Sequence, residues 1–132
     1  FDSIAFVEQG GLAADAPSGF ADRLVFKQIV THTTKPVGFC CGDSDALQDI
    51  LRMASLVAGS EEQLARKPFI WHHAEPISPL RLPADILRRV LICAERQIPL
   101  GFMPMAEAGS TAPATLAGTL AQANAETRDR AP

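Results

Sequence analysis

The residues best suited to chemistry follow a short apolar run at 69–73. His72 and His73 close this run and Glu75 comes two residues later. An imidazole beside a carboxylate can exchange protons or orient a cationic ligand. Neighbouring residues of a strand point to opposite faces, so only one histidine can face a site, and His73 shares its face with Glu75. We predict His73 and Glu75 as catalytic residues. The alternative is that the imidazole packs under a loop.

A second candidate site is the loop 107–111, which reads EAGST and follows the apolar run 98–103. Gly109 allows close approach, and Ser110 and Thr111 carry hydroxyls. Free backbone N–H groups at a helix start would suit an anion such as a substrate carboxylate. We therefore predict Gly109, Ser110 and Thr111 as substrate-binding residues. The alternative is that Ser110 or Thr111 caps the following helix and Gly109 serves only the turn.

Aromatic residues near these loops could bind a cation. Trp71 and Phe102 could surround part of a quaternary ammonium through cation–π attraction, and Trp71 is predicted as a substrate-binding residue. Only 6% of the residues are aromatic and none is Tyr, so a complete aromatic cage is hard to assemble here. Core packing is the competing explanation for both side chains.

Potential metal ligands are present without the spacing of a metal motif. Cys40 or Cys41 with His73 and Glu75 would offer thiolate, imidazole and carboxylate groups from neighbouring strands. No short ligand spacing supports this arrangement, so the sequence predicts no metal site. Asp43 could face the same region, but a role as helix cap is a sufficient explanation for it.

Four strands and the helices between them are predicted to position these residues. Each strand is a short apolar run, and each helix has apolar residues at helical spacing. The predicted strands span 3–9, 37–40, 69–73 and 98–103, and the helices span 18–31, 44–58, 60–66 and 83–96, with a last one opened by 109–113.

Capping residues support several of these helix boundaries. Ser18 is suited to start the first helix, and Asp43 or Ser44 the second. Gly59 occupies the position where a left-handed residue ends a helix. Ser60, followed by acidic residues, is suited to start the short helix after it.

The order of elements predicts an α/β fold of about four βα units. Strand-like runs recur about every 30 residues, close to the roughly 31 residues of one unit in a (β/α)8 barrel. We predict that residues 1–126 form part of such a TIM-type barrel and that 127–132 form a polar tail. An open doubly wound sheet is the structural alternative. The bare sheet edges would favour association unless the missing half or a second copy covers them.

Composition excludes several classes of protein. The 132 residues are 47% hydrophobic and 20% charged, which indicates a globular domain, and a net charge of −3 makes nucleic acid an improbable partner. No apolar run could span a bilayer, so no membrane partner and a cytoplasmic location are expected. The odd count of three cysteines argues against a disulfide framework. The sequence begins with Phe1 and is expected to be part of a longer protein.

Three short sequence motifs point to a known family. They are THTTKP at 31–36, EPISPL at 75–80, and STAPATLAGTL with a closing NAE at 110–126. In these motifs the sequence resembles the trimethylamine methyltransferase family, whose members pass a methyl group from a methylated amine to a corrinoid protein. The similarity extends over about 6–126.

The resemblance implies a longer barrel enzyme that transfers a methyl group from trimethylamine, glycine betaine or a related amine to the Co(I) of a corrinoid. This chain alone is expected to be inactive, because it lacks the other strands of the barrel. The corrinoid would be carried by a partner protein and not bound directly by this segment. Members that use trimethylamine carry pyrrolysine at a position beyond the matched region. A homo-oligomer is compatible with this reading. The rival hypotheses are another barrel enzyme that binds an anion at 109–111, and a non-catalytic remnant or amine-binding module.

Overall fold

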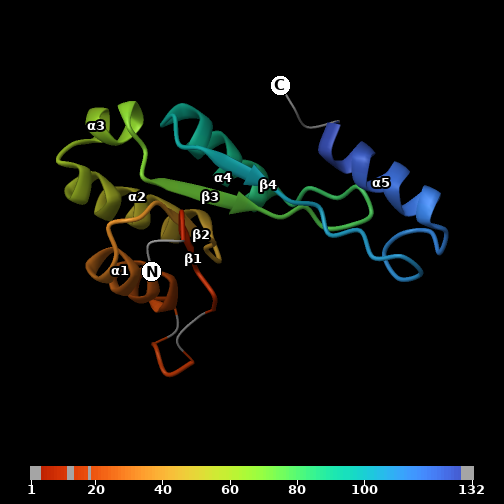
Figure 1. Cartoon of the computed structure of the whole chain (residues 1–132), viewed down its shortest axis with the longest axis horizontal. Helices are drawn as coiled ribbons and strands as arrows, with labels where there is room; N and C mark the ends of the chain where they lie inside the picture. The colour runs from red at the N-terminus through yellow and green to blue at the C-terminus, as the bar shows by residue number, and fades with distance from the viewer. Residues whose placement is uncertain (1–3, 12–13, 18, 129–132) are drawn as a thin grey trace.

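The computed structural model describes residues 4–11, 14–17 and 19–128 and shows an α/β fold with a four-stranded sheet (Figure 1). In chain order its elements are β1 (Val7–Glu8), α1 (Ala21–His32), β2 (Val37–Phe39), α2 (Ser44–Ala58), α3 (Glu61–Arg66), β3 (Ile70–Ala74), α4 (Ala84–Glu95), β4 (Leu100–Phe102) and α5 (Leu116–Arg128).

The sheet is parallel throughout and its strands lie in the order β1-β2-β3-β4. A doubly wound sheet reverses its strand order at a switch point, and the four described strands show no reversal. Consecutive parallel strands joined by helices are compatible with part of a TIM-type unit. All four carboxyl ends therefore lie at one edge of the sheet, where the predicted catalytic residues follow their strand.

The hydrophobic core lies between the sheet and the helices α1 to α4. Phe26 of α1, Leu47 and Ile50 of α2, and Phe39 and Ile70 of the central strands are almost completely buried and belong to one cluster. Each such side chain stabilises the fold by about 1.5–3 kcal/mol through its transfer from water. The core thus fixes one face of β2 and β3 against helices.

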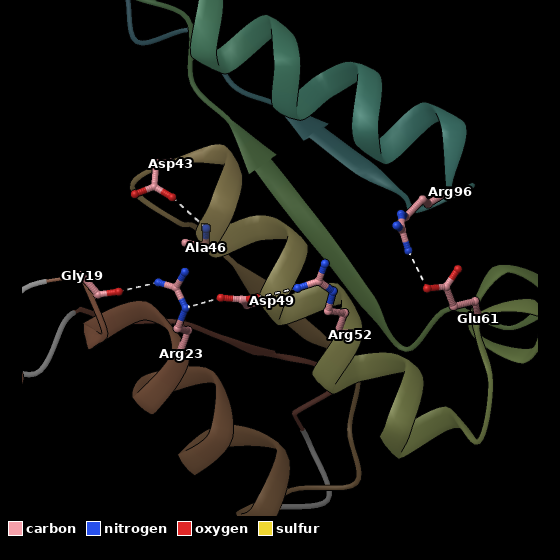
Figure 2. Close-up of polar contacts among 8 residues, drawn as sticks. All are labelled: Gly19, Arg23, Asp43, Ala46, Asp49, Arg52, Glu61 and Arg96. Carbon is pink, nitrogen blue, oxygen red and sulfur yellow. Dashed lines mark hydrogen bonds and ion pairs between the residues drawn. The ribbon is translucent and has the colours of Figure 1, made fainter.

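The boundaries of α2 are set by local hydrogen bonds. Asp43 is its N-cap, and the carboxylate accepts a bond of 2.7 Å from the backbone N–H of Ala46 (Figure 2). Gly59 ends the helix with φ of 98°, a left-handed conformation that glycine adopts without a Cβ clash. Ser60 then caps α3 by accepting from the N–H of Gln63. These caps confirm the predicted start and end of the second helix.

Ion pairs connect the helices at the surface (Figure 2). Arg23 of α1 binds Asp49 of α2 at 2.7 Å and also donates to the carbonyl of Gly19. The hydrogen bond from Arg23 lowers the pKa of the Asp49 carboxyl. Arg96, just after α4, binds Glu61 of α3 at 2.8 Å. Because these pairs are solvated, each is expected to add at most about 1 kcal/mol.

The first strand and the last helix differ most from their predicted boundaries. The first strand is only Val7–Glu8 where 3–9 was expected, because its single neighbour is the short strand β2. The last helix starts at Leu116 and not at 109–113. The predicted cap Ser18 lies outside the described residues, and the residue at the N-cap of α1 is Phe20.

The helix α5 lies apart from the sheet, beyond the carboxyl ends of the strands (Figure 1). Leu116 and Leu120 of its predicted apolar face are exposed, and the residue that it buries is Glu126. The helix continues through Arg128, so it includes the first residues of the predicted polar tail. No helix within the described ranges is both long and apolar enough to cross a membrane.

Candidate functional site at the carboxyl ends of the strands

The two adjacent histidines of β3 lie on opposite faces of the sheet, as strand alternation predicts. His72 is completely buried beside the Phe39 ring, on the face that the helices cover. His73 lies on the other face, together with Trp71 of the same strand. The prediction that only one histidine faces a candidate site is consistent with this placement.

His72 is a neutral core residue. Burial and the nearby Arg89 guanidinium lower its pKa from 6.5 to about 4. Nδ1 lies 3.2 Å from the carbonyl oxygen of Phe39, so the neutral ring donates this hydrogen bond. Nε2 has no hydrogen-bond partner among the described residues. The apolar surroundings therefore keep the ring uncharged near neutral pH.

His73 is 7% exposed and makes two polar contacts through one ring nitrogen. The indole N–H of Trp71 donates to Nε2 at 2.7 Å, and a carboxylate oxygen of Glu8 lies 2.9 Å from the same atom. Nε2 accepts from Trp71 when it carries no proton and donates to Glu8 when it does. The presence or absence of a proton on Nε2 of His73 therefore decides whether this atom bonds to Glu8 or to Trp71.

Glu8 and Phe6 are the functional candidates that were missed from the sequence. Glu8 ends β1 and reaches His73 across β2, and Phe6 packs edge-on against Trp71 with ring centroids 5.1 Å apart. The available signal was their spacing, since Phe6 and Glu8 are two residues apart on a predicted strand and so share one face. Their contact with β3 depends on the strand order.

Two glycines provide the space for these side chains. Gly38 pairs with Trp71 in the register of β2 and β3, and a Cβ at this position would lie 2.5 Å from the indole. Gly101 pairs with His73, and a Cβ there would lie 3.6 Å from the imidazole. Gly38 thus permits the close approach of Trp71, whereas Gly101 leaves ordinary contact distance. Neither glycine was identified as part of a site from the sequence.

Trp71 and Phe102, which were considered as two walls of a cation site, do not lie on the same face of the sheet. Phe102 pairs with Ala74 in the register of β3 and β4, and Ala74 alternates with His73, so Phe102 lies on the face opposite Trp71. The aromatic neighbour of Trp71 is Phe6. Two aromatic rings still face the candidate site, but one of them, Phe6, comes from the residue just before β1.

Cys40, His73 and Glu75 come together at the ends of β2 and β3. One potential ligand atom from each lies within 4.8 Å of the others. Burial raises the pKa of the Cys40 thiol, and the carboxylates of Glu75 and Glu8 add to this effect. The predicted catalytic residues His73 and Glu75 are therefore neighbours, in a site with a thiol and a second carboxylate beside them.

The other two cysteines face the helical side. Burial raises the pKa of both the Cys41 and the Cys93 thiol to about 12. Arg89 of α4 donates a hydrogen bond to the carbonyl oxygen of Cys41 and pairs with Asp85. All three cysteines are free thiols, which agrees with the absence of a predicted disulfide framework. Only Cys40 contributes to the candidate site.

The expectation that Ser110 or Thr111 caps the last helix is wrong. Thr115 occupies the position before α5, and its hydroxyl accepts from the N–H of Gly118 at 3.2 Å. Thr111 instead accepts from the N–H of Glu107 and closes the loop on itself. The PATL sequence that follows the loop therefore contains the true start of the helix.

The loop 107–111 also lacks the predicted free amides at a helix start. The N–H groups of Ser110 and Ala112 donate to the carbonyl of Glu107, and the N–H of Gly109 donates to the carbonyl of Ala112. No hydrogen bond or ion pair among the described residues joins this loop to His73 or Glu75. The premise of an anion site built from backbone amides is thus incorrect, while the role of its side chains stays a prediction.

Comparison with known proteins now adds to this geometry. Residues 12–128 match the family model described as trimethylamine methyltransferase (MTTB). The chain belongs to the MTTB family. It is 32% identical over 98 residues to trimethylamine methyltransferase MttB of Desulfitobacterium hafniense, a match that covers 74% of this chain and 20% of the relative.

Two further relatives of the MTTB chain carry different substrate names. Trimethylamine methyltransferase MttB of Methanosarcina barkeri is 33% identical over 95 residues, which cover 72% of this chain and 18% of the relative. A glycine betaine methyltransferase of D. hafniense strain Y51 is 25% identical over 112 residues, which cover 85% of this chain and 23% of the relative. The matched segment thus corresponds to about a fifth of each relative's length.

Two of the sequence motifs that suggested the MTTB family contact each other. Glu126, in the closing NAE, is completely buried and accepts hydrogen bonds from the Ser78 hydroxyl at 2.7 Å and the Leu80 N–H at 3.0 Å. Ser78 and Leu80 belong to the EPISPL motif. Gln122 donates to the same Glu126 carboxylate at 3.0 Å. Contacts between the EPISPL and NAE motifs therefore hold α5 against the loop that follows β3.

Two surface hollows among the described residues lie away from this site. One is lined by residues that include Leu51, Glu61 and Arg96, and another by residues that include Ile29 and Lys35. Both lie beside loops that lead into strands, at the amino end of the sheet. Because βα folds carry their chemistry at the carboxyl ends of the strands, we assign the candidate site by its side chains and not by these hollows.

Proposed function

We propose that this chain is part of a methyltransferase that takes a methyl group from trimethylamine, glycine betaine or a related methylated amine, with a corrinoid protein as the acceptor. Membership of the MTTB family supports the reaction class. The observation that supports an amine site is the convergence of Trp71 and Phe6 with the Glu8 and Glu75 carboxylates around His73. We further propose that the four βα units are part of a closed (β/α)8 barrel completed by chain beyond this segment.

The proposed site recognises the positive charge and the methyl groups of the amine. The faces of Trp71 and Phe6 attract a quaternary or protonated amine, and Glu8 and Glu75 add negative charge next to them. Gly38 keeps Trp71 close to the sheet and so leaves the open face to the ligand. Ser110 and Thr111 with Gly109 stay proposed contacts for a substrate carboxylate, through hydroxyls and not through the engaged backbone amides.

In the proposed reaction the chain binds and orients the amine. The reduced cobalt of a corrinoid, held by its carrier protein, would supply the nucleophile that accepts the methyl group. In this proposal His73 gives a proton to the nitrogen as the C–N bond breaks, and Glu8, whose carboxylate lies 2.9 Å from Nε2 of His73, orients the imidazole. Positioning and exclusion of water are the main contributions expected from the protein.

The recognition of a cation can be tested by the fluorescence of Trp71, the only tryptophan of the chain. We expect glycine betaine and tetramethylammonium to change this fluorescence. The control ligand is 3,3-dimethylbutanoate, which has the shape of glycine betaine without its positive charge. A Trp71 response to 3,3-dimethylbutanoate as strong as that to glycine betaine would contradict an amine site.

The rival functions make different predictions. A barrel enzyme with an anion site at 109–111 would respond to inorganic phosphate and not to tetramethylammonium. A non-catalytic remnant or amine-binding module would bind the amine but give no methyl transfer even when the rest of the barrel is supplied. Because the amides of 109, 110 and 112 are occupied, the anion-binding rival is the weaker of the two.

A further inference from the structure

We propose that Cys40, His73 and Glu75 form a binding site for a divalent transition-metal ion of the zinc type. The three residues come from the ends of the adjacent strands β2 and β3 and each offers one ligand atom within 4.8 Å of the others. This site lies at the edge of the sheet where βα proteins bind their ligands. Nothing in the spacing of these residues along the sequence predicts it.

The chemistry of the three donors selects the class of metal. A thiolate, an imidazole and a carboxylate together suit Zn²⁺ or Co²⁺, whereas Mg²⁺ and Ca²⁺ prefer oxygen donors alone. Three protein ligands are also the number found in zinc sites that keep one position open for water or a ligand. His73 is buried, Cys40 is partly buried and Glu75 is exposed, so the open position would face solvent.

The second contact of His73 fits a metal ligand. Histidines that bind metals usually donate their other ring N–H to a carboxylate, which fixes the orientation of the ring. Glu8 lies 2.9 Å from Nε2 of His73, and both described polar contacts of the ring use this nitrogen. Nδ1 is then the nitrogen left for the metal. Binding of a metal there would place the proton on Nε2 and so favour Glu8 over Trp71.

The negative charge around the thiol also favours a cation. Both Glu75 and Glu8 act electrostatically on Cys40. Arg89 acts on Cys40 in the opposite sense, but its guanidinium donates to the Cys41 carbonyl and pairs with Asp85 on the helical side. A divalent ion at Cys40 would therefore be attracted by two carboxylates. The proposal does not depend on methyl transfer, because the metal alone is the ligand tested.

The test is a titration of the purified chain with Co²⁺, followed by absorption spectroscopy. Cobalt bound to a thiolate gives a sulfur-to-metal band in the near ultraviolet, and this band is expected for the unaltered chain. It should disappear in Cys40→Ala and persist in the matched control Cys41→Ala, whose side chain is buried on the other side of the sheet. A band of equal strength in both variants, or none in the unaltered chain, would overturn the proposal.

A second measurement needs no variant that could fail to fold. Zn²⁺ added to the unaltered chain should slow alkylation of Cys40 by iodoacetamide at least about tenfold when the ion is well above its Kd, as mass spectrometry of the peptides would show. The fluorescence of Trp71 should change in the same titration, because its hydrogen bond to His73 is lost. If Zn²⁺ leaves the alkylation rate unchanged while glycine betaine lowers it, the site binds amines and not metals.

Discussion

At the scale of single residues, two identical side chains next to each other in β3 have different properties. His72 is enclosed by the core and its pKa is lowered to about 4, whereas His73 contacts Trp71 and Glu8 on the open face. The difference arises from strand alternation and from the helices that cover only one face. Substitutions at these positions should therefore affect different measurements.

His72 should make stability depend on pH. Its pKa is lower in the folded chain than the 6.5 of an unfolded one, so the unfolded state binds more protons between these values. The stabilising effect is present above about pH 6.5 and is lost as the pH falls toward 4, by up to about 3 kcal/mol. Urea unfolding across this range should show the loss, and His72→Asn should reduce it.

The exposed His32 of α1 provides the control for this measurement. His32→Asn removes one histidine from the chain but none from the core. It should leave in place the loss of stability that comes from burial of His72. An equal reduction in His32→Asn and His72→Asn would mean that burial of His72 is not the cause.

Gly38→Ala should displace Trp71. The new Cβ would lie 2.5 Å from the indole, which is less than any normal contact, so the ring must move. Overpacking of this kind costs about 1–3 kcal/mol. Chemical denaturation and Trp71 fluorescence would measure both effects. Gly10→Ala is the matched control, since no atom lies within 4 Å of the added Cβ, and it should change neither quantity.

At the scale of elements, short-range hydrogen bonds set where α2 begins. Asp43→Ala removes the acceptor of the Ala46 N–H, and the loss should lower the free energy of unfolding by about 1 kcal/mol. Asp43→Asn retains an oxygen that can accept the same bond and should cost much less. Chemical denaturation would measure the free energy of unfolding of the two variants. A similar decrease in both would indicate that the charge of Asp43, and not its hydrogen bond as a cap, stabilises the helix.

The attachment of α5 depends on Glu126. In Glu126→Ala the N–H of Leu80 and the hydroxyl of Ser78 lose their shared acceptor, so the loop after β3 should open more often. Loss of one such bond to a charged group costs about 1.5–3 kcal/mol. Hydrogen exchange at the Leu80 amide should accelerate accordingly. Glu95→Ala, an exposed position of α4, should leave this exchange rate unchanged.

At the scale of the whole molecule, the segment presents four strands with two edges, β1 and β4, that have no neighbour among the described residues. It spans about a fifth of its relatives. We expect the chain alone to give no methylation of Co(I) cobalamin from trimethylamine or glycine betaine, because the proposed barrel is incomplete. Absorption spectroscopy of the cobalamin would detect the methylated form, and turnover by the chain itself would refute this expectation.

A chimera tests whether the segment can serve a complete enzyme. The matching segment of the D. hafniense MttB relative would be replaced by this chain and assayed with trimethylamine. Activity should be retained in the chimera and should fall at least about a hundredfold when His73 is changed to Ala, the range expected for loss of acid–base catalysis. Retained activity in His73→Ala would contradict its proposed role without affecting the family assignment.

The sequence by itself determined the elements and the family. Apolar spacing and caps such as Asp43 and Gly59 act within a few residues, so the bounds of α2 could be predicted from local patterns. Strand alternation is also a local property, so the sequence predicted that His72 and His73 point to opposite faces, but not which of these faces the helices cover. The motifs of the trimethylamine methyltransferase family could also be identified in the sequence, and the family-model match over 12–128 confirmed the family.

Only the tertiary structure determined which side chains meet. Glu8 reaches His73 and Phe6 reaches Trp71 because strand order and register place β1 beside β2, one strand away from β3. Cys40 joins His73 and Glu75 for the same reason. The predicted start of α5 was too early, because amides of the loop 107–111 form hydrogen bonds within the loop and do not begin a helix. No single residue type determines this arrangement. Contacts between residues distant in sequence depend on the packing of the whole sheet, so local sequence patterns do not predict them.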